Sequence, residues 1–459
     1  MKLYSSNDLY KLYHGNMLDM LEVIEPNSID SIITDPPYEL NFMSKGWDNA
    51  GVSFQPDTWK KCYEVLKDGG YLLAFGGSRT FHRIACAIED AGFEIRDTIM
   101  WLYGSGFPKS QNIGKMYDKK VGNSRKKIGE TKIGKTSLGD NSGWDTSKNM
   151  KELKASGKVD ITKGNSKWEG WGSCLKPSFE PIIVARKPFK GSLVDNVIEN
   201  GVGGINIDEC RVGSSKKDID KLNKEWDREW NTSYKSFADG VGGSAGFDYS
   251  NAKVKNKGLT GRFPANTILT YDESDFEEVC GGFPNTKGGN RHNTAIRQSD
   301  KNSGYGFEIN TRNEFNDSGS ASRYFYNAKA SKKDRDEGLD NQRKQKVNDG
   351  RQTPIDNPFQ RGETPRRNVH PTVKPTNLMQ YLVRLVTPNG GTILDPFNGS
   401  GSTGKAVMYE NKERNKNYKY IGIELTEEYL PIAKARIEYV CKLTEEEKNE
   451  ERQLSIYDL

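Results

Sequence analysis

Strand-like and helix-like patterns alternate at both ends of this chain, and this alternation limits its fold more than any other feature. Near the N-terminus, apolar runs bounded by Gly or Pro predict strands, and amphipathic stretches between them predict helices. The predicted strands cover 30–35, 71–75 and 94–102, and the predicted helices cover 58–66 and 80–91. Strands that alternate with helices favour a parallel sheet covered by helices on both faces.

The same alternation resumes near the C-terminus. Helices are predicted at 377–386, 402–410 and 427–440, and strands at 392–395 and 418–424. Between the two ends the chain is rich in Gly, Asn and Ser, with short predicted strands at 178–185 and 265–269. A compact core does not tolerate this much loop, so we expect one α/β domain in two halves with a second domain inserted between them.

Shifts in composition divide the chain into six expected segments. They are the N-terminal half of the α/β domain (1–103), a basic insertion (104–176), a return to the core (177–190), a separate mixed domain (191–367), the C-terminal half (368–445) and a charged tail (446–459).

The composition is typical of a soluble globular protein with long polar excursions. Hydrophobic residues make up 34% of the chain, and no apolar run approaches the roughly 18 residues of a membrane span. The first residues lack the pattern of a secretory signal, so we expect a cytoplasmic protein. The six cysteines form no Cys-x-x-Cys pair and have no His at ligand spacing, so we expect small buried hydrophobes and neither a metal nor a disulfide.

The net charge of +5 is unevenly distributed. The segment from Gly104 to Lys176 holds 16 Lys and Arg against 7 Asp and Glu, which leaves the rest of the chain at −4. A basic segment on a nearly neutral body is typical of an arm that binds phosphates. A solvated loop would have the same composition, and charge alone does not separate the two.

The first chemical motif is Asp35-Pro36-Pro37-Tyr38, which follows a predicted buried strand. Ligands of open α/β sheets bind beyond the carboxyl ends of the strands. There the Asp35 carboxylate and the Pro36 carbonyl are suited to accept hydrogen bonds from an exocyclic amino group, which would localise its lone pair for attack. Proline fixes the backbone and brings no N–H, and Tyr38 offers a flat face for stacking on a base.

The second motif runs from a predicted strand into a helix and contains Asp395, Pro396, Phe397, Gly399, Ser400 and Gly401. Glycines let the backbone approach a ligand closely, and a helix N-terminus favours a negative group. Glu424 ends the next strand, where an acidic residue is suited to bind ribose hydroxyls. The start of a phosphate-binding P-loop also fits Gly399 to Lys405, but Ala406 stands where such a loop needs Ser or Thr for Mg²⁺.

The third motif is His370-Pro371-Thr372-Val373-Lys374-Pro375, directly before a predicted helix. Each of its polar residues alone is an ordinary loop residue. Beside a cofactor that carries a carboxylate, Lys374 would have an electrostatic role.

These motifs, in this order, resemble the beta group of DNA amino-methyltransferases, in which the catalytic motif precedes the cofactor motif and a target recognition domain lies between them. The stretches 73–77, 99–110, 175–181 and 321–330 further resemble bacterial and phage or prophage members. The resemblance covers the terminal portions well and the middle in patches. It implies a Rossmann-like α/β fold that binds S-adenosylmethionine, with a mostly parallel sheet and target recognition by 191–367.

The resemblance also implies roles for individual residues. Asp35 and Pro36 would hold the target amino group, and Tyr38 would stack on the flipped base. Pro37 belongs with these three to the catalytic motif. The residues implied to line the cofactor pocket, besides Asp35, are Asn16, Met17, Lys374, Asp395, Pro396, Phe397, Gly399, Ser400, Gly401 and Glu424. Among them, Lys374 would lie near the methionine carboxylate, and Asn16 stands where the family has an acidic residue that contacts the cofactor adenine.

The target base follows partly from the residues and partly from the resemblance. C5-cytosine methylation needs a cysteine nucleophile, usually after a proline, and none of the six cysteines follows proline. Asp at position 35 resembles adenine-N6 enzymes, whereas N4-cytosine enzymes more often carry Ser there, so N4-cytosine is the second candidate. An RNA substrate, a DNA-binding protein on a decayed methyltransferase scaffold, and the P-loop hydrolase that Ala406 disfavours also stay open.

The expected partner is double-stranded DNA, whose phosphates the basic insertion would contact. The residues expected to do so are Lys119, Lys120, Arg125, Lys126 and Lys127. No membrane is expected as a partner. A homodimer and a cognate restriction endonuclease, as in restriction-modification systems, stay open.

Overall fold

The computed structural model describes residues 2–40, 51–103, 110–132, 158–213, 261–270, 285–286, 319–320, 325–328, 332–345 and 366–443. The chain divides into two compact units. The larger unit comprises Met1–Asn206, Asn266–Asp275 and Asn327–Leu459, and the smaller one comprises Ile207–Ala265 and Phe276–Tyr326. The two ends of the chain therefore belong to one unit.

One ten-stranded sheet runs in the order β1-β2-β16-β15-β3-β4-β8-β5-β11-β14. Its strands are β1 (Lys2–Ser6), β2 (Tyr10–His14), β3 (Ile29–Thr34), β4 (Leu66–Phe75), β5 (Glu94–Tyr103), β8 (Phe179–Arg186), β11 (Thr267–Thr270), β14 (Tyr326–Asn327), β15 (Thr392–Asp395) and β16 (Lys419–Glu424). The C-terminal strands β15 and β16 lie between β2 and β3, and this run of strands is parallel through β4. The mostly parallel, Rossmann-like sheet is thus confirmed.

Strand β8 departs from the expected parallel order. It runs antiparallel to both of its neighbours, β4 and β5. The chain leaves β5 at Tyr103 and returns at the same edge, where the Tyr103 N–H donates to the Ser178 carbonyl at 2.9 Å. A strand that starts at the carboxyl edge must run back across the sheet, so its first residues lie beside the ends of the parallel strands.

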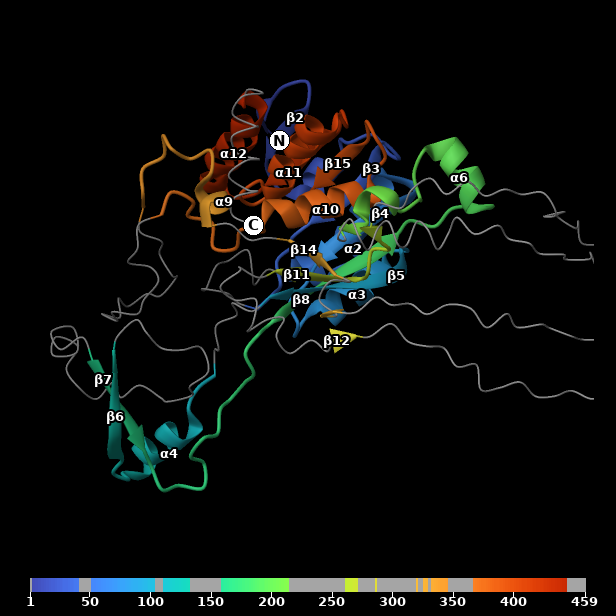
Figure 1. Ribbon diagram of the computed structural model, residues 1–459. Helices are drawn as coiled ribbons and strands as arrows, with labels where there is room; N and C mark the ends of the chain where they lie inside the picture. The colour runs from blue at the N-terminus through green and yellow to red at the C-terminus, as the bar shows by residue number, and fades with distance from the viewer. Residues whose placement is uncertain are drawn as a thin grey trace, which may run out of the picture. The chain divides into compact units, whose positions relative to one another are not determined.

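Helices cover both faces of the sheet (Figure 1). The helices of the larger unit are α1 (Met17–Leu21), α2 (Pro56–Val65), α3 (Phe81–Asp90), α4 (Ile113–Val121), α6 (Leu193–Asn200), α9 (Lys332–Asp336), α10 (Thr376–Val386), α11 (Ser402–Arg414) and α12 (Leu430–Lys442), with 3-10 turns η3 (Val52–Phe54) and η8 (Glu427–Tyr429). The single helix predicted at 427–440 is therefore a 3-10 turn followed by α12. Pro431 stands in the first turn of α12, where its missing N–H costs nothing.

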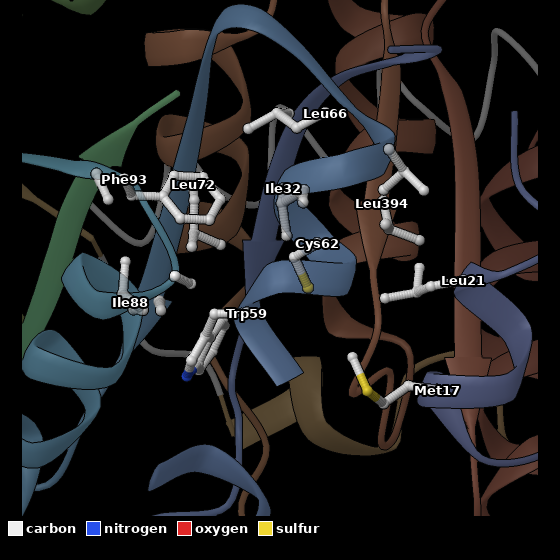
Figure 2. Packing of buried hydrophobic residues seen from close by; sticks show 14 of the residues in the cluster. Met17, Leu21, Ile32, Trp59, Cys62, Leu66, Leu72, Ile88, Phe93 and Leu394 are labelled. Carbon is white, nitrogen blue, oxygen red and sulfur yellow. The ribbon is translucent and has the colours of Figure 1, made fainter. Parts of the chain in front are cut away.

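The core between α1–α3 and the sheet is continuous (Figure 2). Trp59 and Cys62 on α2 are fully buried against Ile32 of β3 and Leu72 of β4. The Trp59 indole N–H donates to the Ser53 carbonyl at 2.9 Å, so the buried ring leaves no polar atom unpaired. Burial of each such side chain contributes about 1.5–3 kcal/mol, and this core holds β3 and its carboxyl end in place.

The basic insertion contains regular structure that its composition does not predict. Asn112 caps the N-terminus of α4, because its side chain accepts from the Lys115 N–H. Strand β6 (Lys126–Lys132) pairs with β7 (Lys158–Lys163) as an antiparallel hairpin. Arg125 joins these elements through ion pairs with Asp118 and Glu169. The ion pairs of Arg125, rather than an apolar stripe, hold this weakly periodic segment in its fold.

The smaller unit contains the 3-10 turn η4 (Asp208–Cys210), the pair β9 (Val212–Gly213) and β10 (Gly261–Arg262), and the pair β12 (Asn285–Thr286) and β13 (Gly319–Ser320). Its limits differ from the segment 191–367. Helix α6 and strand β11 group with the larger unit, because β11 pairs in parallel with β5.

The cysteines differ in part from the expectation of small buried hydrophobes. Cys62 and Cys210 are buried, but Cys86 and Cys174 are exposed, so the expectation is wrong for those two. Cys280 and the tail 446–459 lie outside the described residues. Among the helices of the described segments, none combines the length and apolar character needed to cross a membrane.

Candidate active site

The carboxyl ends of the parallel strands border a cavity of about 1210 Å³ in the larger unit. The sequence-predicted residues that line it are Asn16, Met17, Asp35, Pro36, Pro37, Tyr38, Lys374, Asp395, Pro396, Phe397, Gly399, Ser400 and Glu424. They come from distant parts of the chain because β2, β3, β15 and β16 end at the same edge of the sheet. Gly401 is not among the lining residues; it packs against Ala433 on α12.

Asp35 and Lys374 form an ion pair at one side of this cavity. Nζ of Lys374 lies 2.6 Å from Oδ2 of Asp35 and 3.4 Å from Oε2 of Glu180. The other Asp35 oxygen, Oδ1, is buried and has no hydrogen-bond partner among the described residues. Burial by itself lowers the pKa of Lys374, but the two carboxylates outweigh it and raise that pKa above its usual value.

Tyr38 is fixed beside this pair. Its hydroxyl donates to Oε2 of Glu180 at 2.8 Å, and its ring packs on Gly77, where an added Cβ would lie 3.2 Å from Cδ2 of the ring. Burial, followed by the charges of Asp35 and Glu180, raises the Tyr38 pKa well above its usual value, so the hydroxyl stays neutral. The flat side chain expected to meet a base therefore has a fixed position.

Glu180, at the start of β8, is the polar residue of this cluster that the motifs did not single out. It lies in the stretch 175–181, which resembles the family, but the sequence pattern predicts no chemical role for its carboxylate. Its carboxylate accepts from the Tyr38 hydroxyl and, at 3.4 Å, from the hydroxyl of Tyr103. Strand pairing places it opposite Trp101 on β5, a tertiary relationship that only the antiparallel course of β8 produces.

Asp395 braces the loop between β15 and α11. Its two oxygens accept hydrogen bonds from the hydroxyls of Thr34 and Thr403, and from the N–H of Phe397. Burial raises the Asp395 pKa to about 6, although these hydrogen bonds lower it. Asp395 is only 2% exposed and its oxygens accept three hydrogen bonds from neighbouring residues, so it stabilises the conformation of the loop.

Glu424 is bound to the same loop from β16. Its carboxylate accepts the N–H of Gly399 at 2.6 Å and the N–H of Thr426 at 2.7 Å. Burial raises the Glu424 pKa to about 7, against the lowering effect of these two hydrogen bonds. Gly399 itself lies against His370, because a Cβ there would come within 2.9 Å of Nε2.

Three further lining residues also have local structural partners. Asn16 caps α1, because its side chain accepts the Leu18 N–H at 3.1 Å. Ser400 accepts from Arg436, a fully buried arginine on α12. His370 donates from Nδ1 to the Thr372 carbonyl, and burial lowers its pKa to about 3, so it is neutral.

The P-loop hypothesis fails at Lys405. Its side chain is fully buried, and Nζ lies 2.6 Å from carboxylate oxygens of both Asp334 and Glu337 on the α9 segment. An ammonium that is buried and paired with two carboxylates is not available to bind a nucleotide phosphate.

The residues expected to contact DNA divide into two groups. Lys119, Lys120 and Lys126 are exposed. Lys127 is exposed as well, but its ammonium pairs with Glu130 and Asp160. The Arg125 side chain is only 11% exposed and is held by Asp118 and Glu169, so this arginine stabilises the insertion rather than facing outward.

Comparison with known proteins bears on this site. A family model described as DNA methylase matches residues 29–435. The chain is 22% identical over 237 residues to the type II methyltransferase M.HindIII of Haemophilus influenzae, covering 42% of this chain and 64% of that protein. It is 41% identical over 229 residues to M2.DpnII of Streptococcus pneumoniae, covering 44% and 82%. The chain thus spans less than two thirds of the first relative.

A third relative is the DNA adenine methyltransferase YhdJ of Escherichia coli, which is 32% identical over 118 residues, or 24% of this chain and 40% of that one. Among solved structures, the PvuII DNA methyltransferase (cytosine-N4-specific) is similar with a TM-score of 0.40 and 12% identity, over 97% of this chain and 91% of that one.

Proposed function

This chain belongs to the DNA methylase family, and on that premise we propose that it transfers a methyl group from S-adenosylmethionine to N6 of adenine in double-stranded DNA. S-adenosylmethionine is the cofactor of such enzymes. The observation that carries the proposal is the free, buried Oδ1 of Asp35 at the cavity, with Lys374 holding the other oxygen.

Two observations support adenine over cytosine as the target base. Asp35 directly precedes Pro36-Pro37-Tyr38, and an Asp at this position resembles the adenine-N6 enzymes. The relative YhdJ is named a DNA adenine methyltransferase. N4-cytosine presents a similar amino group to the same oxygen, so this choice is the part of the proposal that product identification must decide.

The residues around Asp35 account for the chemistry. With a target base in the cavity, Oδ1 of Asp35 accepts a hydrogen bond from the exocyclic amino group and localises the lone pair of its nitrogen. Lys374 holds Oδ2, so the carboxylate keeps one orientation. Tyr38 supplies the face on which a base taken out of the duplex stacks, and this stacking offsets part of the few kcal/mol that flipping costs. When bound, the cofactor supplies an electrophilic methyl group on a sulfonium.

The cofactor fits the other side of the cavity. The tight turn around Gly399, with His370 at its back, leaves backbone where a side chain would fill the space. Glu424 presents carboxylate lone pairs for ribose hydroxyls, and Phe397 lines the cavity as an apolar surface. The expectation that Lys374 meets the methionine carboxylate gives way to a role beside Asp35, because two carboxylates already compensate its charge.

DNA contacts are assigned to the exposed lysines of the insertion, Lys119, Lys120 and Lys126. Each would neutralise a phosphate and release counterions, whereas Arg125 maintains the fold of the segment. Base recognition is assigned to the middle of the chain, as in the beta group.

The direct test of activity uses S-adenosylmethionine with a tritiated methyl group and unmethylated plasmid DNA. We expect label in the DNA with the wild-type chain and none when Asp35 is replaced by Ala. Label in RNA but not in DNA, or no label despite cofactor binding, would contradict the proposal.

A further inference from the structure

We propose that Glu180 is a positioning residue of the methyl-transfer site, which holds Lys374 and Tyr38 so that Oδ1 of Asp35 stays free for the target amino group. This role rests on the proposed function of the site. It adds to the site a residue from β8, outside the three chemical motifs of the sequence.

The Glu180 carboxylate contacts side chains from three parts of the fold. Oε2 of Glu180 receives the Tyr38 hydroxyl at 2.8 Å and lies 3.4 Å from Nζ of Lys374, while Oε1 lies 3.4 Å from the Tyr103 hydroxyl. The Glu180 side chain is 22% exposed and that of Lys374 is 8% exposed. Glu180 therefore links the end of β5, the loop after β3 and the segment before α10 within one cavity.

The Tyr38 hydroxyl has a single proton, which it donates in a hydrogen bond to the Glu180 carboxylate. The hydroxyl also lies near Asp35, whose charge contributes to raising the Tyr38 pKa. If the Glu180 carboxylate were absent, Asp35 would be the remaining carboxylate beside this hydroxyl, and the hydroxyl would compete with the target amino group for it. By accepting this hydrogen bond, Glu180 keeps Oδ1 of Asp35 available and the Tyr38 ring in place.

Glu180 also helps to keep the Lys374 ammonium protonated. Lys374 is buried beside the carboxylates of Asp35 and Glu180, the neutral hydroxyl of Tyr38, and His370, which is neutral because burial lowers its pKa to about 3. Tyr103 joins this group through its hydrogen bond to Glu180. Removal of one carboxylate leaves burial opposed by Asp35 alone, so the ammonium becomes easier to deprotonate.

The test compares Glu180→Gln with the wild type and with Glu94→Gln, a control carboxylate on β5 that pairs with Arg186 outside the cavity. Initial rates of tritiated methyl transfer to unmethylated plasmid DNA are measured from pH 6 to 11, together with calorimetric binding of S-adenosylmethionine. For Glu180→Gln we expect kcat to fall about ten- to a hundredfold, cofactor affinity to stay within about twofold, and the alkaline limb of the rate profile to move to lower pH.

Glu180→Asp separates charge from position. It keeps the carboxylate but shortens the side chain, so we expect a reduced rate with the alkaline limb restored toward that of the wild type. Adding Tyr38→Phe to Glu180→Gln removes the competing hydroxyl, so the two effects should be less than additive.

The outcomes distinguish the role of Glu180 from the proposed function of the site. A Glu180→Gln rate and alkaline limb equal to those of the wild type would overturn the role of Glu180 and leave the proposed function intact. Loss of cofactor binding in that variant would overturn it as well, because Glu180 would then support the fold. No transfer of label by the wild type would overturn the proposed function itself.

Discussion

Nζ of Lys374 lies 2.6 Å from Oδ2 of Asp35, although the two residues are 339 positions apart in the chain. The pair joins the end of β3, in the N-terminal half, to the segment before α10, in the C-terminal half. Lys374 binds one carboxylate oxygen of a residue that lines the cavity, and the other oxygen is buried without a partner among the described residues. The site is therefore complete only when both halves of the α/β unit have assembled.

Replacement of Asp35 by Ala should abolish methyl transfer and leave S-adenosylmethionine binding within a few-fold of the wild type. The amino group loses its acceptor, whereas the loop at Gly399 and Glu424 is untouched. Transfer of tritiated methyl to DNA and calorimetric cofactor binding measure the two effects. Asp57→Ala, at an exposed position on α2, serves as the control. Methylation near the wild-type rate by Asp35→Ala would refute the role of this carboxylate.

The positions of Asp35, Asp395 and Glu424 at one edge of the sheet were predictable from the sequence, because each follows an apolar run that forms a parallel strand. The partners of these residues were not predictable. Glu180 lies beside Lys374 because β8 runs antiparallel, and nothing in the spacing of 178–185 reveals the direction of that strand.

Arg125 illustrates the same limit in the basic insertion. Composition places it among five residues suited to phosphates, but its charge is matched by Asp118 and Glu169, residues on either side of the β6–β7 hairpin. Composition gives the charge of a segment, and only tertiary contacts tell which charges are already neutralised.

Glu424→Gln should change the pH dependence of both stability and cofactor affinity. The Glu424 pKa rises from about 4.5 to about 7 on folding, so the folded chain holds this proton more tightly than the unfolded chain. The contribution of this carboxyl to stability should therefore fall as pH rises from about 4.5 to 7. Cofactor affinity should rise across pH 7, because the ionised carboxylate is the better acceptor for ribose hydroxyls.

Thermal unfolding without cofactor and calorimetric cofactor binding, each from pH 5 to 8, measure these two trends. Glu424→Gln should remove both, and Glu428→Gln, an exposed neighbour, should retain them. Identical pH profiles for the wild type and Glu424→Gln would show that Glu424 does not titrate in this range.

Gly401→Ala should destabilise the chain and weaken S-adenosylmethionine binding. Gly401 has φ of +73°, and an added Cβ would lie 2.9 Å from Cα of Ala433, a backbone atom that cannot turn aside. The left-handed conformation alone costs about 1–2 kcal/mol for a non-glycine residue. Gly390→Ala is a matched control, since its φ is +75° but no atom lies within 4 Å.

Urea unfolding and calorimetry separate these effects. We expect the larger loss of stability, and the only loss of cofactor affinity, for Gly401→Ala. Equal effects of the two substitutions would mean that contact with α12 does not position the loop.

Combined replacement of Lys119, Lys120 and Lys126 by Ala should weaken DNA binding and flatten its dependence on salt. Each lost phosphate contact reduces the slope of log K against log salt by about 0.9. Lys127→Ala should change the slope little, because Glu130 and Asp160 already pair with that lysine. Fluorescence anisotropy with duplex DNA at several salt concentrations measures the slopes, and an unchanged slope in the triple variant would exclude these lysines from the DNA interface.

Arg125→Ala should behave differently from the lysine variants. It leaves Asp118, whose side chain is 1% exposed, without its cation, and breaking a buried pair in this way costs about 3–5 kcal/mol. We expect proteolysis within the insertion to accelerate. Resistance equal to that of the wild type would contradict a structural role for Arg125.

The central claim is methyl transfer to N6 of adenine, and the identity of the methylated nucleoside tests it most directly. Unmethylated genomic DNA is incubated with the chain and S-adenosylmethionine carrying a deuterated methyl group, digested to nucleosides and examined by mass spectrometry. We predict deuterated N6-methyldeoxyadenosine with the wild-type chain, and no deuterated nucleoside with Asp35→Ala. Deuterated N4-methyldeoxycytidine would contradict the choice of base, and DNA without any deuterated methyl group would contradict the proposed activity.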